Sequence, residues 1–159
     1  MIRALYSNLT SPRYAKIVPI NMFHHMNFDG CSKGNPGLAG AGAVIYNENF
    51  QEIWGGSVFV GKNINSNHSE YAALIFGLEN ALQMNIKELI IRGDSQLIIN
   101  QMKGKYKCKN VDLLEHYTRA KNLESKFHSI QYIHVSREYN KRADELSNIP
   151  VKDFLSNYK

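Results

Sequence analysis

Alternating and continuous apolar runs, divided by polar turns, predict three strands in the first part of the chain. Polar and apolar residues mix over residues 25–32, which favours a strand that ends near Asp29. Residues 33–37 then form a dense turn signal of Gly, Asn and Pro. Two apolar runs, at 41–46 and 50–60, flank a short polar connector and indicate a β-hairpin.

The middle of the chain alternates between helical periodicity and one buried strand. A helix is predicted to start with Asn67 as its N-cap and Glu70 as the capping-box partner, and to end at Asn85. Residues 89–91 form a compact apolar run that is typical of a buried strand. A short helix then follows and closes at Gly104.

The last third of the chain predicts two more helices around a fifth strand. An apolar stripe predicts a helix over 111–127, and residues 130–135 fit a strand. A short last helix is expected at 142–148, because Pro150 follows and does not continue a helix. Three antiparallel strands followed by strand–helix units predict an α/β domain with a mixed sheet flanked by helices.

This pattern divides the chain into an N-terminal extension at 1–25, one domain at 26–150 and a C-terminal tail at 151–159. The first 25 residues contain no Asp or Glu and carry three basic residues. That composition fits either an organelle transit segment or a short arm that packs on the domain. We expect a cytoplasmic protein, or a mitochondrial or other organellar one if this extension is a transit segment.

Composition narrows the class of partner. Hydrophobic residues make up 43% and charged residues 21%, which is ordinary for a globular domain. The formal net charge of +5 favours a polyanionic partner. No apolar run approaches the roughly 20 residues that span a bilayer, so we expect no membrane contact. The two cysteines give neither a disulfide framework nor a zinc spacing, and we expect a monomer.

Four acidic residues stand where predicted elements begin or end. Asp29 and Asp94 lie at strand ends, and Glu70 and Asp144 lie in the first turns of helices. Each has an ordinary explanation as a turn residue, a helix cap or a partner of the helix dipole. On neighbouring parallel strands, however, Asp29 and Asp94 would lie side by side beneath the other two. Four converging carboxylates repel one another unless a cation binds, and oxygen ligands favour magnesium.

Four ordered blocks resemble the type-one ribonuclease H family, in particular its compact branch in bacteria, archaea and plants. The blocks are FDGCSKGNPG at 28–37, NHSEYAAL at 67–74, GDSQLI at 93–98 and HVSREYNKRAD at 134–144, each with its acidic residue in place. The resemblance spans about residues 26–150.

The resemblance implies the ribonuclease H-like fold with five strands, and hydrolysis of the RNA strand of RNA–DNA hybrids. It implies two Mg²⁺ ions, with Mn²⁺ as a substitute, and products with 5′-phosphate and 3′-hydroxyl ends. By position, Asp29 would bridge both ions and Asp144 would hold the ion that activates water. Glu70 and Asp94 would complete the shell of the second ion, which stabilises the leaving oxygen.

The same blocks imply contacts with the 2′-hydroxyls and sugars of the hybrid, which distinguish RNA from DNA. The residues placed there are Gly30, Cys31, Ser32, Asn35, Asn67 and Gln96. The amides of Asn35 and Asn67 can both donate to and accept from a hydroxyl. Asn35 and Ser66 are also placed near a DNA phosphate, although for Ser66 we favour a solvated loop residue.

The chain departs from the better-studied members of the family in two places. It has no room for an inserted basic helix near residues 104–110, and lysines at 103, 105, 107 and 109 either grip phosphates or form a solvated loop. Arg137 stands where those members carry a mobile histidine that aids product release. An arginine cannot shuttle protons, so it would act electrostatically. His134, at a strand end, is expected to be structural.

Two other classes of function stay open. One is another carboxylate-bearing enzyme, such as a resolvase, integrase or exonuclease, which would lack the asparagine-bearing turn. The other is a nucleic-acid binding module without activity, which would usually have lost an acid. A domain that once belonged to a reverse transcriptase and now acts alone is a third origin for the same site.

Overall fold

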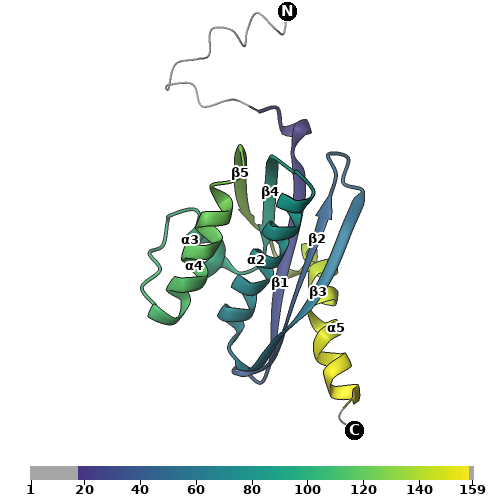
Figure 1. The fold of residues 1–159 in the computed structure, drawn as a ribbon, viewed down its shortest axis with the longest axis vertical. Helices are drawn as coiled ribbons and strands as arrows, with labels where there is room; N and C mark the ends of the chain where they lie inside the picture. The colour runs from purple at the N-terminus through teal and green to yellow at the C-terminus, as the bar shows by residue number, and fades with distance from the viewer. Residues whose placement is uncertain (1–17, 158–159) are drawn as a thin grey trace, which may run out of the picture.

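The computed structural model describes residues 18–157 (Figure 1). The elements in chain order are η1 (Ile20–Met22), β1 (His24–Lys33), β2 (Gly37–Tyr46), β3 (Glu52–Ile64), α2 (Ser66–Gln83), β4 (Glu88–Gly93), α3 (Gln96–Met102), α4 (Val111–Glu124), β5 (Ser129–His134), η2 (Arg137–Tyr139) and α5 (Lys141–Asn157). None of the described helices is long and apolar enough to cross a membrane.

β1 lies at the centre of a five-stranded sheet with the order β3-β2-β1-β4-β5. It pairs antiparallel with β2 and parallel with β4, and β4 pairs parallel with β5. The predicted mixed sheet, with its meander of three antiparallel strands, is therefore confirmed. Because β1 and β4 run in the same direction, their carboxyl ends open at the same edge of the sheet, where ligands usually bind in folds of this kind.

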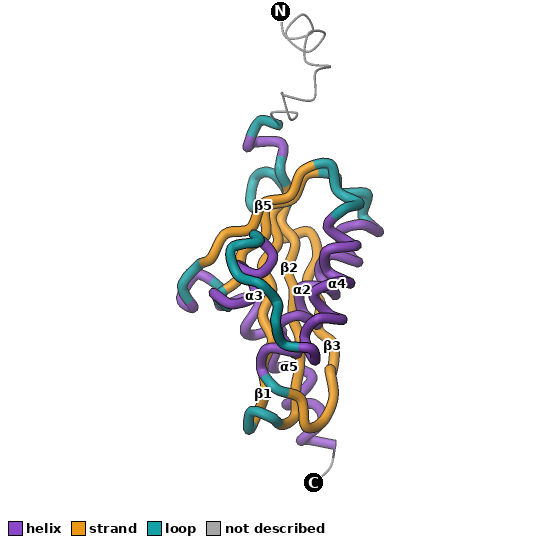
Figure 2. The backbone as a smooth tube through the Cα atoms, turned by 90° about the vertical axis from the view of Figure 1, so that its left-hand side faces the viewer, coloured by secondary structure: helices purple, strands orange, loops and turns teal. Residues whose placement is uncertain are grey.

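The alternation of side chains along β2 divides the core between the two faces of the sheet. Ala43 and Ile45 belong to the main apolar cluster, which also contains buried residues of α2, α3 and α4. Val44, between them, points to the other face and joins Ala143 and Leu146 of α5 in a smaller cluster. Figure 2 shows the sheet edge-on, with α2 and α4 together on one side of it. Helices therefore cover both faces of the sheet, α2, α3 and α4 on one and α5 on the other.

The predicted C-terminal tail and the end of the last helix at Pro150 are wrong. α5 continues through Pro150 to Asn157, and Val151 is buried. Proline lacks the N–H that would bond the carbonyl four residues earlier, which is Leu146. That carbonyl instead accepts a hydrogen bond of 2.6 Å from the Ser57 hydroxyl of β3. A tertiary contact therefore compensates for the missing helical bond, and the helix continues.

The predicted N-terminal boundary at residue 25 is also wrong by a few residues. Phe23 is 1% exposed and belongs to the packed domain. β1 begins at His24, and His25 pairs with Tyr46 of β2 and with Ile90 of β4. The expectations for a transit segment or a packed arm concern residues 1–25, of which 1–17 lie outside the described residues.

Candidate active site

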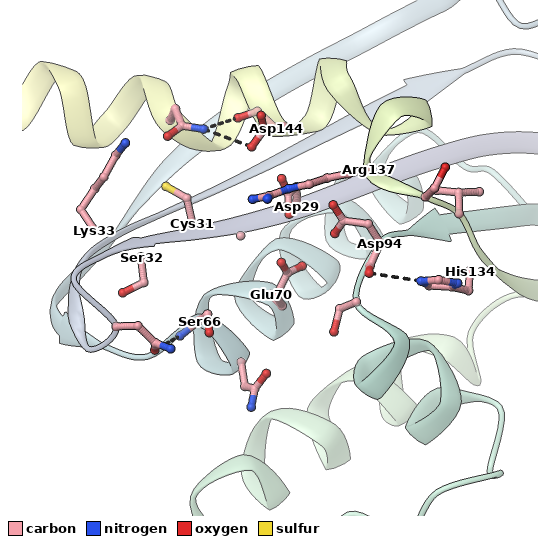
Figure 3. Close-up of a pocket in the computed structure, with 17 residues that line it drawn as sticks. Asp29, Cys31, Ser32, Lys33, Ser66, Glu70, Asp94, His134, Arg137 and Asp144 are labelled. Atoms are coloured by element: carbon pink, nitrogen blue, oxygen red, sulfur yellow. Dashed lines mark hydrogen bonds between the residues drawn. The ribbon is translucent and has the colours of Figure 1, made fainter.

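Three carboxylates from three different elements meet at the carboxyl edge of the sheet. Asp29 is on β1, Glu70 is on α2, and Asp94 directly follows β4. Their ligand atoms all lie within 4.8 Å of one another. Figure 3 shows the three side chains pointing into the same space. We call Asp29, Glu70 and Asp94 the acidic cluster.

The register of the two central strands places Asp29 beside Asp94. In the parallel pairing of β1 with β4, Asn27 lies opposite Arg92. Two residues further along each strand, with the same offset, are Asp29 and Asp94. Because side chains repeat every two residues in a strand, both carboxylates leave the sheet on one face. The placement expected from parallel neighbours is therefore what the structure has.

A close approach of α2 to β1 brings Glu70 to the same place. A Cβ added to Gly30 would lie 2.3 Å from the carbonyl carbon of Ser69 and 2.4 Å from the nitrogen of Glu70. Only glycine leaves room for the first turn of α2 at this point of β1. Gly30 was predicted as a substrate contact, and it lines the groove, but its clearest role is to seat Glu70.

The helix caps differ from those predicted, and the difference bears on function. α2 is capped by Asn65, whose Oδ1 accepts a hydrogen bond of 2.9 Å from the His68 N–H. Ser95 caps α3 by accepting from the Ile98 N–H at 3.3 Å. The prediction of Asn67 as N-cap is therefore wrong. Neither Glu70 nor Asp94 is needed as a cap, so the ordinary explanation of these two acids is removed.

Asp144 lies in the first turn of α5 and lines the same groove, but it stands outside the acidic cluster. The buried Asn140 ties this end of α5 to β1. Its Nδ2 donates to the Phe28 carbonyl at 2.9 Å, and its Oδ1 accepts from Asn27 at 3.1 Å. The Asn140 carbonyl in turn accepts from the Asp144 N–H at 3.1 Å. Asn140 is therefore a positioning residue that the sequence analysis missed.

Burial of the acidic cluster disfavours its charged form. The pKa of Asp29 is raised from 3.8 to about 7, mainly by desolvation and in part by the charge of Asp94. Burial, with the charge of Asp29, also raises the pKa of Glu70 well above its usual range. Burial raises the pKa of Asp94, and the Arg137 guanidinium opposes this. One oxygen of Glu70, Oε2, is buried without a hydrogen-bond partner.

These features fit a divalent cation. The carboxylates converge, their pKa values are raised, and one buried oxygen has no partner. A bound cation would supply the positive charge that offsets their repulsion. A donor set made only of carboxylate oxygens suits a hard ion such as Mg²⁺ rather than a softer metal. The predicted metal ligands therefore pass this chemical test, with Asp144 near enough to Asp29 to influence its pKa.

The acidic cluster forms the floor of an open groove of about 690 Å³. The residues that line it are Asp29, Gly30, Cys31, Ser32, Lys33, Asn35, Ser66, Asn67, Glu70, Asp94, Ser95, His134, Val135, Ser136, Arg137, Asp144 and Asn148. Of the predicted substrate contacts, only Gln96 is not in this set. It is exposed on α3, and its contact with substrate stays a prediction.

Several predicted contacts already have partners within the protein. The Ser32 hydroxyl donates to the Ile64 carbonyl at 2.6 Å, and the Cys31 thiol donates to the Ser147 carbonyl at 3.1 Å. Asn35 Oδ1 accepts from the Ser66 N–H at 2.9 Å, which joins the β1–β2 turn to the start of α2. These bonds hold the rim of the groove in a defined shape.

Lys33 and Asn148 line the groove but were not predicted. Lys33 follows Cys31 and Asp29 at a spacing of two along β1, which places all three on one side of the strand. Asn148 follows Asp144 at a spacing of four in α5, which places both on one face of the helix. These spacings were the signals that could have found them.

Arg137 and His134 stand at the other end of the groove. Arg137, in η2, reaches into the groove (Figure 3) and stabilises the charged form of Asp94. His134 Nε2 lies 3.2 Å from the Asp94 carbonyl oxygen and donates to it in the tautomer protonated at Nε2. This contact agrees with the structural role expected of His134.

The lysine-rich connection between α3 and α4 lies outside the groove. The side chains of Lys103, Lys105, Lys107 and Lys109 are exposed. Within residues 18–157 none of them lines the groove or forms one of the ion pairs found. Phosphate binding by these lysines stays a prediction.

Comparison with known proteins gives consistent matches. A family model described as "Reverse transcriptase-like" matches residues 27–149. The bifunctional protein Rv2228c of Mycobacterium tuberculosis is 39% identical over 120 residues, which are 76% of this chain and 33% of that protein. Ribonuclease HI of Halobacterium salinarum is 37% identical over 129 residues, covering 81% of this chain and 64% of that protein. The chain thus spans about a third of the mycobacterial relative and under two thirds of the archaeal one.

Among solved structures, LC11-RNase H1 in complex with an RNA/DNA hybrid matches with a TM-score of 0.78. The two chains are 36% identical, and the match covers 83% of this chain and 99% of the other. The residues that the family model matches, 27–149, include the four blocks that carry the acidic residues.

Proposed function

Because this chain belongs to the ribonuclease H family, we propose that it hydrolyses the RNA strand of RNA–DNA hybrids with two Mg²⁺ ions. The products would carry 5′-phosphate and 3′-hydroxyl ends, and Mn²⁺ would substitute for Mg²⁺. The observation that carries the proposal is the acidic cluster, whose ligand atoms lie within 4.8 Å of one another, with Asp144 in the same groove. The hybrid in the LC11-RNase H1 structure supports the choice of substrate.

The arrangement of the acids suggests how they divide two ions between them. Asp29 belongs to the acidic cluster with Glu70 and Asp94, and the charge of Asp144 also influences its pKa, which suits a ligand shared by both ions. Asp29 would be shared, Glu70 and Asp94 would complete one shell, and Asp144 would complete the other. When bound, two such ions supply an activated water and neutralise charge on the leaving oxygen of an in-line displacement.

Substrate selection would fall to polar groups on the groove rim. Asn67 lies on the first turn of α2 beside Glu70, and Asn35 lies on the β1–β2 turn. Their amides can accept from and donate to a 2′-hydroxyl, which is exposed in the shallow minor groove of a hybrid. Arg137 would hold a phosphate close to Asp94 without transferring a proton.

The decisive experiment compares the unsubstituted protein with Asp29→Asn on a labelled RNA–DNA hybrid in Mg²⁺. We expect cleavage by the first and binding without cleavage by the second, with kcat reduced roughly a thousandfold or more. Asp153→Asn is the matched control, because Asp153 is an exposed carboxylate on α5 that does not line the groove.

Parallel substrates separate the other classes of function. Cleavage of duplex DNA in preference to the hybrid would favour a resolvase-like or exonuclease-like enzyme. An intact hybrid that is nevertheless bound by the unsubstituted protein would favour a binding module. Equal activity of the unsubstituted protein and Asp29→Asn would overturn the proposed use of the acidic cluster.

A further inference from the structure

Asp144 is held in the groove differently from the other three carboxylates. Its backbone is fixed, because α5 touches the sheet at Gly42, where an added Cβ would lie 2.5 Å from the Ser147 nitrogen. The first turn of α5 is also tied to β1 through Asn140. Asp144 is half-buried, as Asp94 is, but it lies outside the acidic cluster. What remains adjustable is the rotation of its side chain.

One neighbouring side chain restrains that rotation. Asn148 Nδ2 lies 3.2 Å from Asp144 Oδ1 and 2.8 Å from the Asp144 carbonyl oxygen, so one amide group donates toward both (Figure 3). Asn148 itself lines the groove. Because Oδ1 accepts this hydrogen bond, the other carboxylate oxygen of Asp144 is left to bind a cation in the groove. The carboxylate is thereby presented in one orientation rather than several.

We propose that Asn148 is a positioning residue that orients Asp144 as a ligand of the second divalent ion. The identity of that ion rests on the function proposed above. Groups that hydrogen-bond a metal ligand fix its orientation, and their removal typically weakens metal binding by about 10–100-fold.

A purely structural explanation of Asn148 makes a different prediction. Asn80 in α2 donates to the Phe76 carbonyl, four residues earlier, at 2.8 Å. This is the same backbone contact that Asn148 makes with Asp144, and both asparagines are half-buried. Position 76 carries no carboxylate and is not part of the groove. Asn80→Ala therefore measures how much this side-chain-to-backbone hydrogen bond alone contributes to stability.

The test compares Asn148→Ala, Asn148→Gln and Asn80→Ala in the full chain. Binding of Mn²⁺ without nucleic acid is counted by electron paramagnetic resonance, and thermal unfolding is recorded beside it. We expect Asn148→Ala to leave the tighter ion unchanged and to raise the Kd of the weaker ion about tenfold. Asn148→Gln keeps an amide four residues after Asp144 and should recover most of this loss. Asn80→Ala should lower stability without changing either Kd.

Hybrid cleavage at varied Mg²⁺ gives a second readout, where the half-saturating concentration should rise by a similar factor in Asn148→Ala. Equal Mn²⁺ binding by the unsubstituted protein and Asn148→Ala would overturn the proposal, as would a single bound ion in the unsubstituted protein. The Mn²⁺ result does not require cleavage. An unsubstituted protein that binds two ions but leaves the hybrid intact would refute the proposed function and still decide the role of Asn148.

Discussion

The groove is built from two regions that are held in place by different means. The acidic cluster is positioned by backbone geometry, through the register of β1 with β4 and the contact at Gly30. The second region, which we call the C-terminal wall, consists of Arg137, Asp144 and Asn148 from η2 and α5. There the orientation of the functional carboxylate depends on a side-chain hydrogen bond.

The carboxylates of the acidic cluster must be held rigidly, whereas the side chains of the C-terminal wall need less exact placement. Buried carboxylates at short distances tolerate little displacement, because each shift changes both their repulsion and their grip on an ion. Placement by main chain meets that demand. Asp144, whose orientation depends on one side-chain hydrogen bond, and the exposed Arg137 are placed by side-chain contacts, which suits groups that meet an incoming substrate or release a product. Substitutions in the two regions should therefore have different consequences.

The largest effect is expected where the backbone contact of the acidic cluster is broken. In Gly30→Ala the new methyl group would meet main-chain atoms of Ser69 and Glu70 at 2.3–2.4 Å, so α2 must move away. Overpacking of this kind costs about 1–3 kcal/mol of stability. Activity should fall at least about a hundredfold, since a misplacement near 1 Å costs about that much. Urea unfolding and hybrid cleavage measure the two effects.

Gly61→Ala is the useful control for this prediction. Gly61 lies on β3 with φ 152°, so alanine is strained there also, but it does not line the groove. It should lose stability while keeping activity. If Gly30→Ala retained full activity, the main-chain contact would not be what positions Glu70.

The second prediction concerns the metal-free protein and its response to pH. Asp29 has a pKa of about 7 when folded, against 3.8 ordinarily, so folding favours its protonated form. Its contribution to stability is complete below about pH 4 and is lost as pH rises through 7. Glu70 acts in the same direction. Mg²⁺, which binds the ionised form, should restore stability at the upper end of this range.

Another buried group, His25, changes stability with pH in the opposite direction, so its contribution must be separated from that of Asp29. Burial lowers the pKa of His25 to about 4, so its contribution is lost as pH falls below its ordinary 6.5. The difference in Tm between the unsubstituted protein and Asp29→Asn removes this shared effect. With divalent ions removed by a chelator, the Tm of Asp29→Asn should rise relative to that of the unsubstituted protein as pH increases from 4 to 7. A constant difference across that range would show that Asp29 is not desolvated as described.

The same two regions mark how far the sequence alone could predict the site. Strand alternation and element order placed Asp29 beside Asp94, because parallel pairing is a regular geometry. The caps were harder, since Asn65, Ser66 and Asn67 are all good N-cap residues, and so are Asp94 and Ser95. Local sequence cannot choose among adjacent candidates, and the choice decided which side chains were left for the groove.

Tertiary contacts explain the other differences. A helix rule predicts an end at Pro150, but it does not include the Ser57 hydroxyl, 89 residues away in sequence, that satisfies the Leu146 carbonyl. The pairing of Asn148 with Asp144 is local and has the right spacing, yet its meaning depends on both side chains facing one groove. Only the fold places that groove beside α5.

The smallest predicted effect lies in the C-terminal wall. Arg137→Ala removes a positive charge that favours the ionised form of Asp94, and it removes a cation from the rim of the groove. It leaves the acidic cluster in place, since no backbone contact depends on that side chain. We expect turnover to slow about tenfold while the Kd for an uncleaved hybrid changes by no more than about twofold, as for one screened surface charge. Arg137→Lys keeps the charge without the planar fork and should recover only part of the rate.

Arg142→Ala is the control, because Arg142 pairs with Glu52 and Glu145 outside the groove. Single-turnover and multiple-turnover cleavage together locate the effect. A loss confined to multiple turnover places Arg137 at product release, an equal loss in both places it at the scissile phosphate, and unchanged rates in both would leave it an ordinary surface residue.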